Sequence, residues 1–152
     1  MQILHQLAEN RILITTLVAW AISCVLKGLI YIVANKEFKV NRFFGSGGMP
    51  SSHSATVVSL AVITGLAEGF DTAYFALSFV LALVVMYDAS GIRRAAGQHA
   101  RFINMLMDAI MAQDPEEKQT KLKEILGHTP LEVFAGAALG IAVALISYIY
   151  FK

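Results

Sequence analysis

The fold is decided by residues 12–34, which read ILITTLVAWAISCVLKGLIYIVA. These 23 residues carry one charge, Lys27, and as a helix they are long enough to cross a hydrocarbon layer of roughly 30 Å. The whole chain has the same character, because 57% of its 152 residues are hydrophobic and only 15% are charged. A soluble domain of this length does not need so many apolar residues, so the surplus is expected to face lipid. We therefore predict an integral membrane protein.

Three further apolar segments follow along the chain. Residues 51–66 are short for a full span, whereas residues 130–151 are long enough. Between them, an apolar run at residues 72–86 continues in helical composition towards Ala112, so its second part is expected to leave the bilayer. The sequence predicts an all-α, polytopic membrane helix bundle with about four transmembrane helices and a helical extension after the third. No linker rich in proline or serine divides the chain, which favours one membrane-embedded domain over residues 1–152.

Most of the positive charges fall between the apolar segments. With four crossings, the loop after the first span and the segment between the third and fourth spans emerge on one side of the membrane, opposite both termini. That side carries a series of cations: Lys36, Lys39, Arg42, Arg93, Arg94, Arg101, Lys118, Lys121 and Lys123. Lysine and arginine favour the cytoplasmic side, so this side is predicted to face the cytoplasm. The net charge of +1 argues against nucleic acid as a partner, because nucleic-acid binding uses a concentrated basic surface.

The loop after the first span contains the segment GGMPSSHS at residues 47–54. Glycine lets the backbone approach a ligand closely, and proline and serine suit the first turn of a helix. Free N–H groups at a helix start attract anions, so Ser51 and Ser52 fit a phosphate site with His53 beside it. A flexible loop with an ordinary serine cap and an interfacial histidine explains the same residues. Local physics alone does not decide between the two interpretations.

A second candidate segment, LGHTPLE, occupies residues 126–132. Histidine acts as a nucleophile or as an acid and base near neutral pH when a carboxylate fixes its tautomer and stabilises its charged form. His128 and Glu132 are four residues apart, a spacing that places them on the same helix face. The pattern from Thr129 to Glu132 also reads as a capping box with Pro130 at the first helical position. Glu132 therefore has two possible roles, in chemistry and in closing the helix start.

Two further sets of charges could serve an anion site. Lys27 lies inside the first span, where a lysine either reaches along the helix to the interface or faces the bundle interior and meets an anion. Asp88, Arg93 and Arg94 follow the third apolar run, and arginine binds phosphate through a fork of donors that Asp88 could hold in place. The arginines could equally form a basic collar at the membrane surface. The sequence does not separate Arg93 from Arg94.

These motifs together resemble those of the type 2 phosphatidic acid phosphatase and vanadium-dependent haloperoxidase superfamily. The segments GGMPSSHSA at residues 47–55, DASGIRR at residues 88–94 and LGHTPLEV at residues 126–133 are most similar to its divergent bacterial and plant branch. The resemblance covers nearly the whole chain. It implies an all-α membrane protein, in a bacterial plasma membrane, whose site handles a phosphate group.

The resemblance also implies roles for individual residues. His53 matches the histidine that protonates the leaving group, His128 the nucleophilic histidine, and Glu132 its carboxylate partner. Ser51 and Ser52 match the phosphate-binding turn, and Lys27 stands for an early lysine of the superfamily pattern. No metal or other cofactor is implied.

Three departures from the superfamily pattern stand out. Serine replaces glycine at Ser52, and glutamate replaces aspartate at Glu132. The usual serine–arginine pair before the nucleophilic histidine is also absent. Leu122 stands at the position of that arginine, between Lys121 and Lys123, so Arg93 or Arg94 would have to supply the charge.

The expectation from these observations is a phosphatase of the lipid phosphatase type, acting on a lipid or isoprenoid phosphate through a phosphohistidine. Two alternatives remain. The missing arginine favours a non-catalytic membrane module that binds anionic lipid or a protein partner. A metal-assisted phosphotransferase using Asp88 and Glu132 would instead depend strictly on magnesium.

Overall fold

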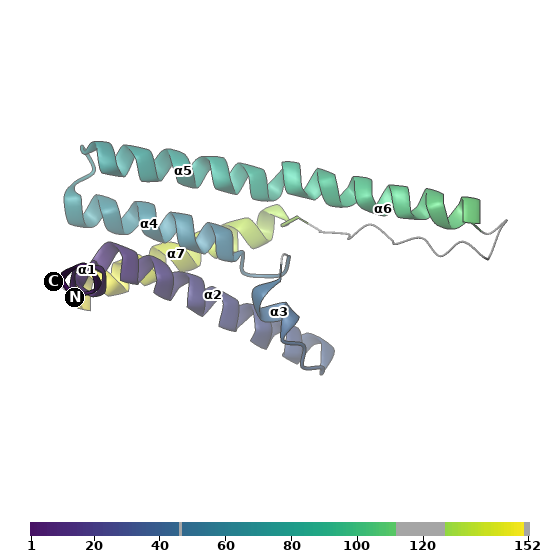
Figure 1. Ribbon diagram of the computed structural model, residues 1–152, viewed down its shortest axis with the longest axis horizontal. Helices are drawn as coiled ribbons and strands as arrows, with labels where there is room; N and C mark the ends of the chain where they lie inside the picture. Colours follow the sequence, from purple (N-terminus) through teal and green to yellow (C-terminus); the bar gives the residue numbers. More distant parts are fainter. Residues whose placement is uncertain (46, 112–126, 151–152) are drawn as a thin grey trace.

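The computed structural model describes residues 1–45, 47–111 and 127–150, and every regular element in these ranges is a helix. The chain order, shown in Figure 1, is α1 (Gln2–Glu9), α2 (Arg11–Asn35), α3 (Asn41–Phe44), α4 (Ser52–Glu68), α5 (Ala73–Ser90), α6 (Ile92–Met111) and α7 (Pro130–Tyr150). The all-α prediction is confirmed. The short helices α1 and α3 were not predicted, because the residues that form them show no long apolar run.

Among the described residues, three helical segments are long and apolar enough to cross a membrane. They are Arg11–Asn35, Ala73–Ala109 and Pro130–Tyr150, and the second of them takes in α5 and most of α6. The remaining long helix, α4, has 17 residues and is shorter than these spans, as its short apolar run predicted. Gly91 separates α5 from α6, and α6 continues away from the bundle in Figure 1, so the expected helical extension is present.

Helix α4 lies at the centre of the bundle and packs against α2, α5 and α7. Its contact with α7 is close because glycines of α7 face its backbone. A Cβ atom at Gly136 would lie 2.3 Å from the carbonyl oxygen of Ser51, and one at Gly140 would lie 2.6 Å from that of Ala55. Small residues four apart allow helix backbones to approach in this way inside membranes. The packing fixes the start of α7 against the start of α4.

The two ends of the bundle differ in what they carry. Both termini and the turn from α4 to α5 lie at one end in Figure 1. The connection from α2 to α4, the junction of α5 with α6 and the beginning of α7 lie at the other end. The four packed helices therefore alternate in direction, as expected from four crossings. Both motif segments fall at the same end of the bundle.

Candidate functional site

The start of α4 is built by a glycine loop and a serine cap. Gly47 and Gly48 have φ angles of 86° and 88°, a region that favours glycine. The Ser51 hydroxyl accepts a hydrogen bond from the Ser54 backbone N–H at 3.3 Å and another from the Ser54 hydroxyl at 3.1 Å. Ser51 is therefore the N-cap of α4, and the first N–H groups of the helix point into the loop region.

Lys27 lies beside this helix start. Its side chain is only 4% exposed, and Nζ donates to the Gly45 carbonyl at 3.2 Å and to the Ser52 hydroxyl at 3.5 Å. A Cβ atom at Gly48 would be 3.3 Å from the Lys27 Cγ, so glycine is what lets the loop close over the lysine. The side-chain nitrogen of Lys27 is thus buried between the glycine loop and the start of α4.

His128 and Glu132 form a close pair at the start of α7. His128 Nδ1 and Glu132 Oε2 are 2.8 Å apart, and the histidine side chain is 3% exposed. The same Oε2 accepts from the Thr129 backbone N–H at 3.3 Å, while the Glu132 N–H donates to the Thr129 hydroxyl at 3.3 Å. The capping box and the histidine pair therefore coexist, and one carboxylate oxygen serves both.

Backbone hydrogen bonds join the two motifs to each other and to α5. The Ser51 N–H donates to the Glu132 carbonyl at 3.0 Å, and the His128 N–H donates to the Ala89 carbonyl at 3.0 Å. The second bond satisfies a carbonyl in the last turn of α5, where helix carbonyls lack intrahelical partners. As a result, the ring centroids of His53 and His128 lie 5.9 Å apart with an interplanar angle of 66°.

The two ring nitrogens of His128 have different surroundings. Nδ1 is held by Glu132, whereas Nε2 is buried and forms no hydrogen bond with any described residue. A neutral imidazole that donates through Nδ1 leaves the lone pair on Nε2. The geometry therefore leaves the Nε2 lone pair without a hydrogen-bond donor among the described residues, and covered from solvent in this structure.

Of the two arginines predicted to bind phosphate, the structure describes the side chain of Arg94 and not that of Arg93. Arg94 is exposed at the start of α6 and makes no hydrogen bond or ion pair with the described part of the site. The Arg93 side chain lies outside the described residues, as do Leu122 and its two neighbouring lysines. Asp88 is half-buried in the last turn of α5, next to the carbonyl that receives the His128 N–H. No cluster of three histidine, cysteine or carboxylate side chains suited to a metal occurs among the described residues.

Sequence reasoning missed two structural supports of the site. One is the Ala89 carbonyl, for which the sequence holds no signal because any residue supplies such a group. The other is the close packing of Gly136 and Gly140 on α4, which the four-residue glycine spacing within an apolar helix could have indicated.

Comparisons with known proteins identify the family. Residues 8–143 match the Divergent PAP2 family, so the chain belongs to it, and the resemblance drawn from the motifs is confirmed. The chain is 38% identical over 157 residues to YuiD of Bacillus subtilis (strain 168), described as an uncharacterized membrane protein. That match covers 96% of this chain and 99% of the relative. No solved structure matches the chain. With its apolar helices, the chain is an integral membrane protein related to type 2 phosphatidic acid phosphatases.

Proposed function

We propose that the protein hydrolyses a lipid or isoprenoid phosphate through a phosphohistidine at His128. The observation that carries this proposal is the pairing of His128 Nδ1 with Glu132, which leaves Nε2 without a hydrogen-bond partner among the described residues. The His53 ring, the Lys27 ammonium group and the start of α4 lie around the same end of the bundle. Phosphoryl transfer depends mainly on positioning and on charge stabilisation, which this arrangement supplies.

The reaction would proceed in two steps. Nε2 of His128 attacks phosphorus and forms an N–P bond, while the bond to the lipid oxygen breaks and His53 gives that oxygen its proton. Water then attacks the phosphohistidine, gives a proton to His53, and releases inorganic phosphate and free His128. Glu132 stabilises the imidazolium character that His128 gains, and Lys27 with the first N–H groups of α4 stabilises the non-bridging oxygens.

The burial of His128 Nε2 favours a second candidate function, which is the binding of anionic lipid without catalysis. Because Nε2 of His128 is buried, the atoms that cover it must move before it can attack a bound phosphate. A non-catalytic module that binds anionic lipid at the start of α4 needs no such movement. Binding without turnover would identify this alternative.

A panel of lipid phosphates tested with purified protein separates the candidates. The proposed reaction predicts release of inorganic phosphate that persists in chelator, while His128→Ala abolishes turnover because no covalent intermediate forms. Thermal protection by phosphate without any turnover would support the non-catalytic module. Turnover that chelator abolishes and magnesium restores would support a metal-assisted phosphotransferase, and full activity in His128→Ala would refute the phosphohistidine.

The site end of the bundle is proposed to face the cytoplasm, from the lysines and arginines of its connecting segments. Met49, 39% exposed in the glycine loop, and Asp71, exposed in the turn from α4 to α5, offer matched positions for cysteine labelling. Native Cys24 is buried and should give little background. Met49→Cys should react only with a membrane-permeant reagent in intact cells, whereas Asp71→Cys should also react with an impermeant one. The reverse pattern would place the site outside.

A further inference from the structure

A stripe of residues along α4 leads away from the proposed phosphate site. Ser52, Thr56, Leu60, Thr64 and Glu68 recur every four residues and form one row that winds gradually around α4. This row lies between α2 and α5, which both pack on α4, whereas the backbones of α2 and α5 do not approach each other closely in the described part of the chain. Helix α4 is therefore the floor of a groove whose walls are α2 and α5.

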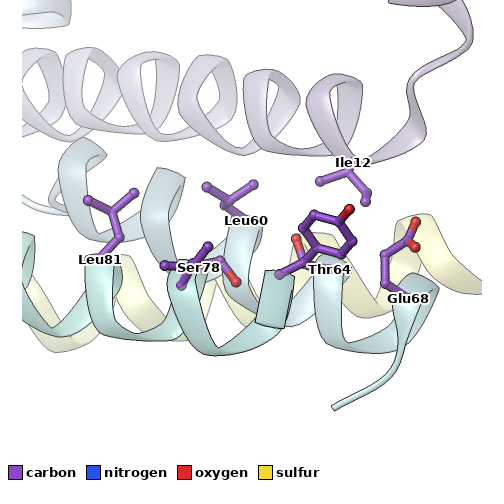
Figure 2. A pocket seen from close by; sticks show the side chains of 8 residues that line it. Ile12, Leu60, Thr64, Glu68, Ser78 and Leu81 are labelled. Carbon is purple, nitrogen blue, oxygen red and sulfur yellow. The ribbon is translucent and has the colours of Figure 1, made fainter. Parts of the chain in front are cut away.

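Two hollows lie along this groove. The hollow next to the site has a volume of about 310 Å³ and is lined by Trp20, Ser52, His53, Thr56, Val57 and Val85. The second has a volume of about 560 Å³ and is lined by Leu60, Thr64 and Glu68 of α4 together with residues of α2 and α5. Figure 2 shows Ile12 on one side of this second hollow and Ser78 and Leu81 on the other. The hollows thus follow each other along the same three helices.

Two of the polar residues that line the hollows have hydroxyl groups that are already hydrogen-bonded. The Thr56 hydroxyl donates to the Ser52 carbonyl at 2.7 Å, and the Ser78 hydroxyl donates to the Phe75 carbonyl at 2.9 Å. These hydroxyl groups are satisfied within their own helices, as is usual for serine and threonine in membrane helices. The Thr56 and Ser78 hydroxyls therefore offer no free donor to the groove, and a hydrocarbon chain that lies against them breaks neither hydrogen bond.

The two ends of the groove are polar. Ser52 and His53 line the hollow at one end, where Lys27 Nζ lies 3.5 Å from the Ser52 hydroxyl, and Glu68 stands at the other. The distance from Ser52 to Thr64 along α4 is roughly 18 Å at 1.5 Å per residue. This arrangement matches a ligand with an anionic head at the cationic end and one extended apolar chain. The carboxylate of Glu68 would repel an anion at the far end and so fixes the direction of binding.

We infer that this groove binds the single long hydrocarbon chain of an amphiphilic phosphate, with its head at Ser52 and Lys27. The inference rests on the proposed function and narrows its substrate class to phosphates that carry one extended chain, such as a prenyl or alkyl phosphate. A single helix, α4, forms the floor of the groove between α2 and α5, a width suited to one chain. Each added methylene packs against the groove lining, so affinity should rise with chain length until the chain reaches Glu68.

The protein supplies its own reporter for this inference. Trp20 is the single tryptophan of the chain and lines the hollow nearest the site. In phosphatidylcholine nanodiscs, hexadecyl phosphate brominated near the phosphate should quench Trp20, because bromine quenches on contact. Unlabelled hexadecyl phosphate should restore the fluorescence by competition.

Moving the tryptophan tests the path of the chain. In Trp20→Phe with Leu81→Trp, the reporter moves to the second hollow, and bromine near the methyl end should become the stronger quencher. Trp20→Phe with Leu83→Trp is the matched control. Leu81 and Leu83 lie on the same helix with similar exposure, 47% and 53%, but only Leu81 lines the hollow. In the control, unlabelled hexadecyl phosphate should restore no fluorescence.

The outcomes separate the groove from the phosphate site. Equal quenching and equal competition at positions 81 and 83 would refute the groove. If hexadecanol competes as strongly as hexadecyl phosphate, the phosphate group contributes nothing to binding. That result would refute the phosphate site at Ser52 and Lys27, and with it the proposed function, even if the groove itself bound the chain. Competition by hexadecyl phosphate at position 81, with a weaker effect of hexadecanol and none at position 83, is the expected result.

Discussion

Replacing Glu132 by glutamine should separate the two roles of this residue. Its Oε2 atom accepts both from His128 Nδ1 at 2.8 Å and from the Thr129 N–H at 3.3 Å. The carbonyl oxygen of glutamine can take the same position and keep the capping box, since glutamine also serves there. What Glu132→Gln removes is the negative charge that favours a positively charged His128 during phosphoryl transfer.

The size of the effect follows from the hydrogen bond that changes. A hydrogen bond to a charged group contributes about 1.5–3 kcal/mol and a neutral one about 0.5–1.5 kcal/mol, so the loss is about 1–2 kcal/mol. If that difference is felt in the transition state, turnover should fall roughly 5- to 30-fold. Thermal stability should change little, because the backbone contacts of the cap remain.

Thr129→Ala is the matched control for this prediction. It removes the hydroxyl that accepts from the Glu132 N–H at 3.3 Å and leaves the pair with His128 intact. Loss of such a cap costs about 1 kcal/mol of stability. Turnover of a lipid phosphate and the thermal unfolding midpoint should be measured for both variants. Native turnover in Glu132→Gln, together with unchanged phosphate release in Thr129→Ala, would refute a role for the charge and leave Glu132 as a capping residue only.

Three further predictions address packing, the cation and the acid. Gly136→Ala should destabilise the bundle by about 1–3 kcal/mol through overpacking against α4. Ala138→Gly, on the exposed side of α7, should cost at most about 1 kcal/mol. Equal unfolding midpoints for the two variants would contradict the close approach of α7 to α4. Lys27→Met should weaken the affinity for phosphate, measured by thermal protection, roughly tenfold or more, since it removes a charged donor. Unchanged protection would exclude Lys27 from the site. His53→Ala should slow release of a lipid alkoxide about 10²- to 10⁴-fold but affect an aryl phosphate much less, and equal losses would contradict the acid role.

The fold followed from the sequence because its main signals are long. An apolar run such as residues 12–34 leaves few alternatives to a membrane helix, and the order of such runs fixes which loops share an end. The central position of α4 could not be predicted from the sequence. Its 17 residues look like the weakest span, yet α4 contacts α2, α5 and α7. Burial on several sides is decided by neighbouring helices, which a pattern within one segment does not describe.

For the candidate site, local spacing carried more information than composition. The four-residue interval from His128 to Glu132 and the serine cap at Ser51 are both realised in the structure. The orientation of Lys27 was open, because a lysine near a helix end can point either way, and contacts with Gly45 and Ser52 decide it. The sequence did not separate Arg93 from Arg94, because both follow the third apolar run directly, and the Arg93 side chain lies outside the described residues.

The charges around the start of α4 account for how a phosphate site could persist without the superfamily's serine–arginine pair. The N-terminus of α7 is occupied by its own Glu132, whose carboxylate meets the Thr129 N–H. The N-terminus of α4 is capped only by the neutral Ser51, so about half a positive charge remains there for an anion. Lys27 places its side-chain amino group in the protein interior, 3.5 Å from the Ser52 hydroxyl, where its protonated form would add a positive charge. A phosphate monoester carries about −1.5 to −2 charges at neutral pH, so these two groups balance most of it. We infer that α7 serves the nucleophile and α4 the phosphate, and that an arginine would refine the site without being required for binding.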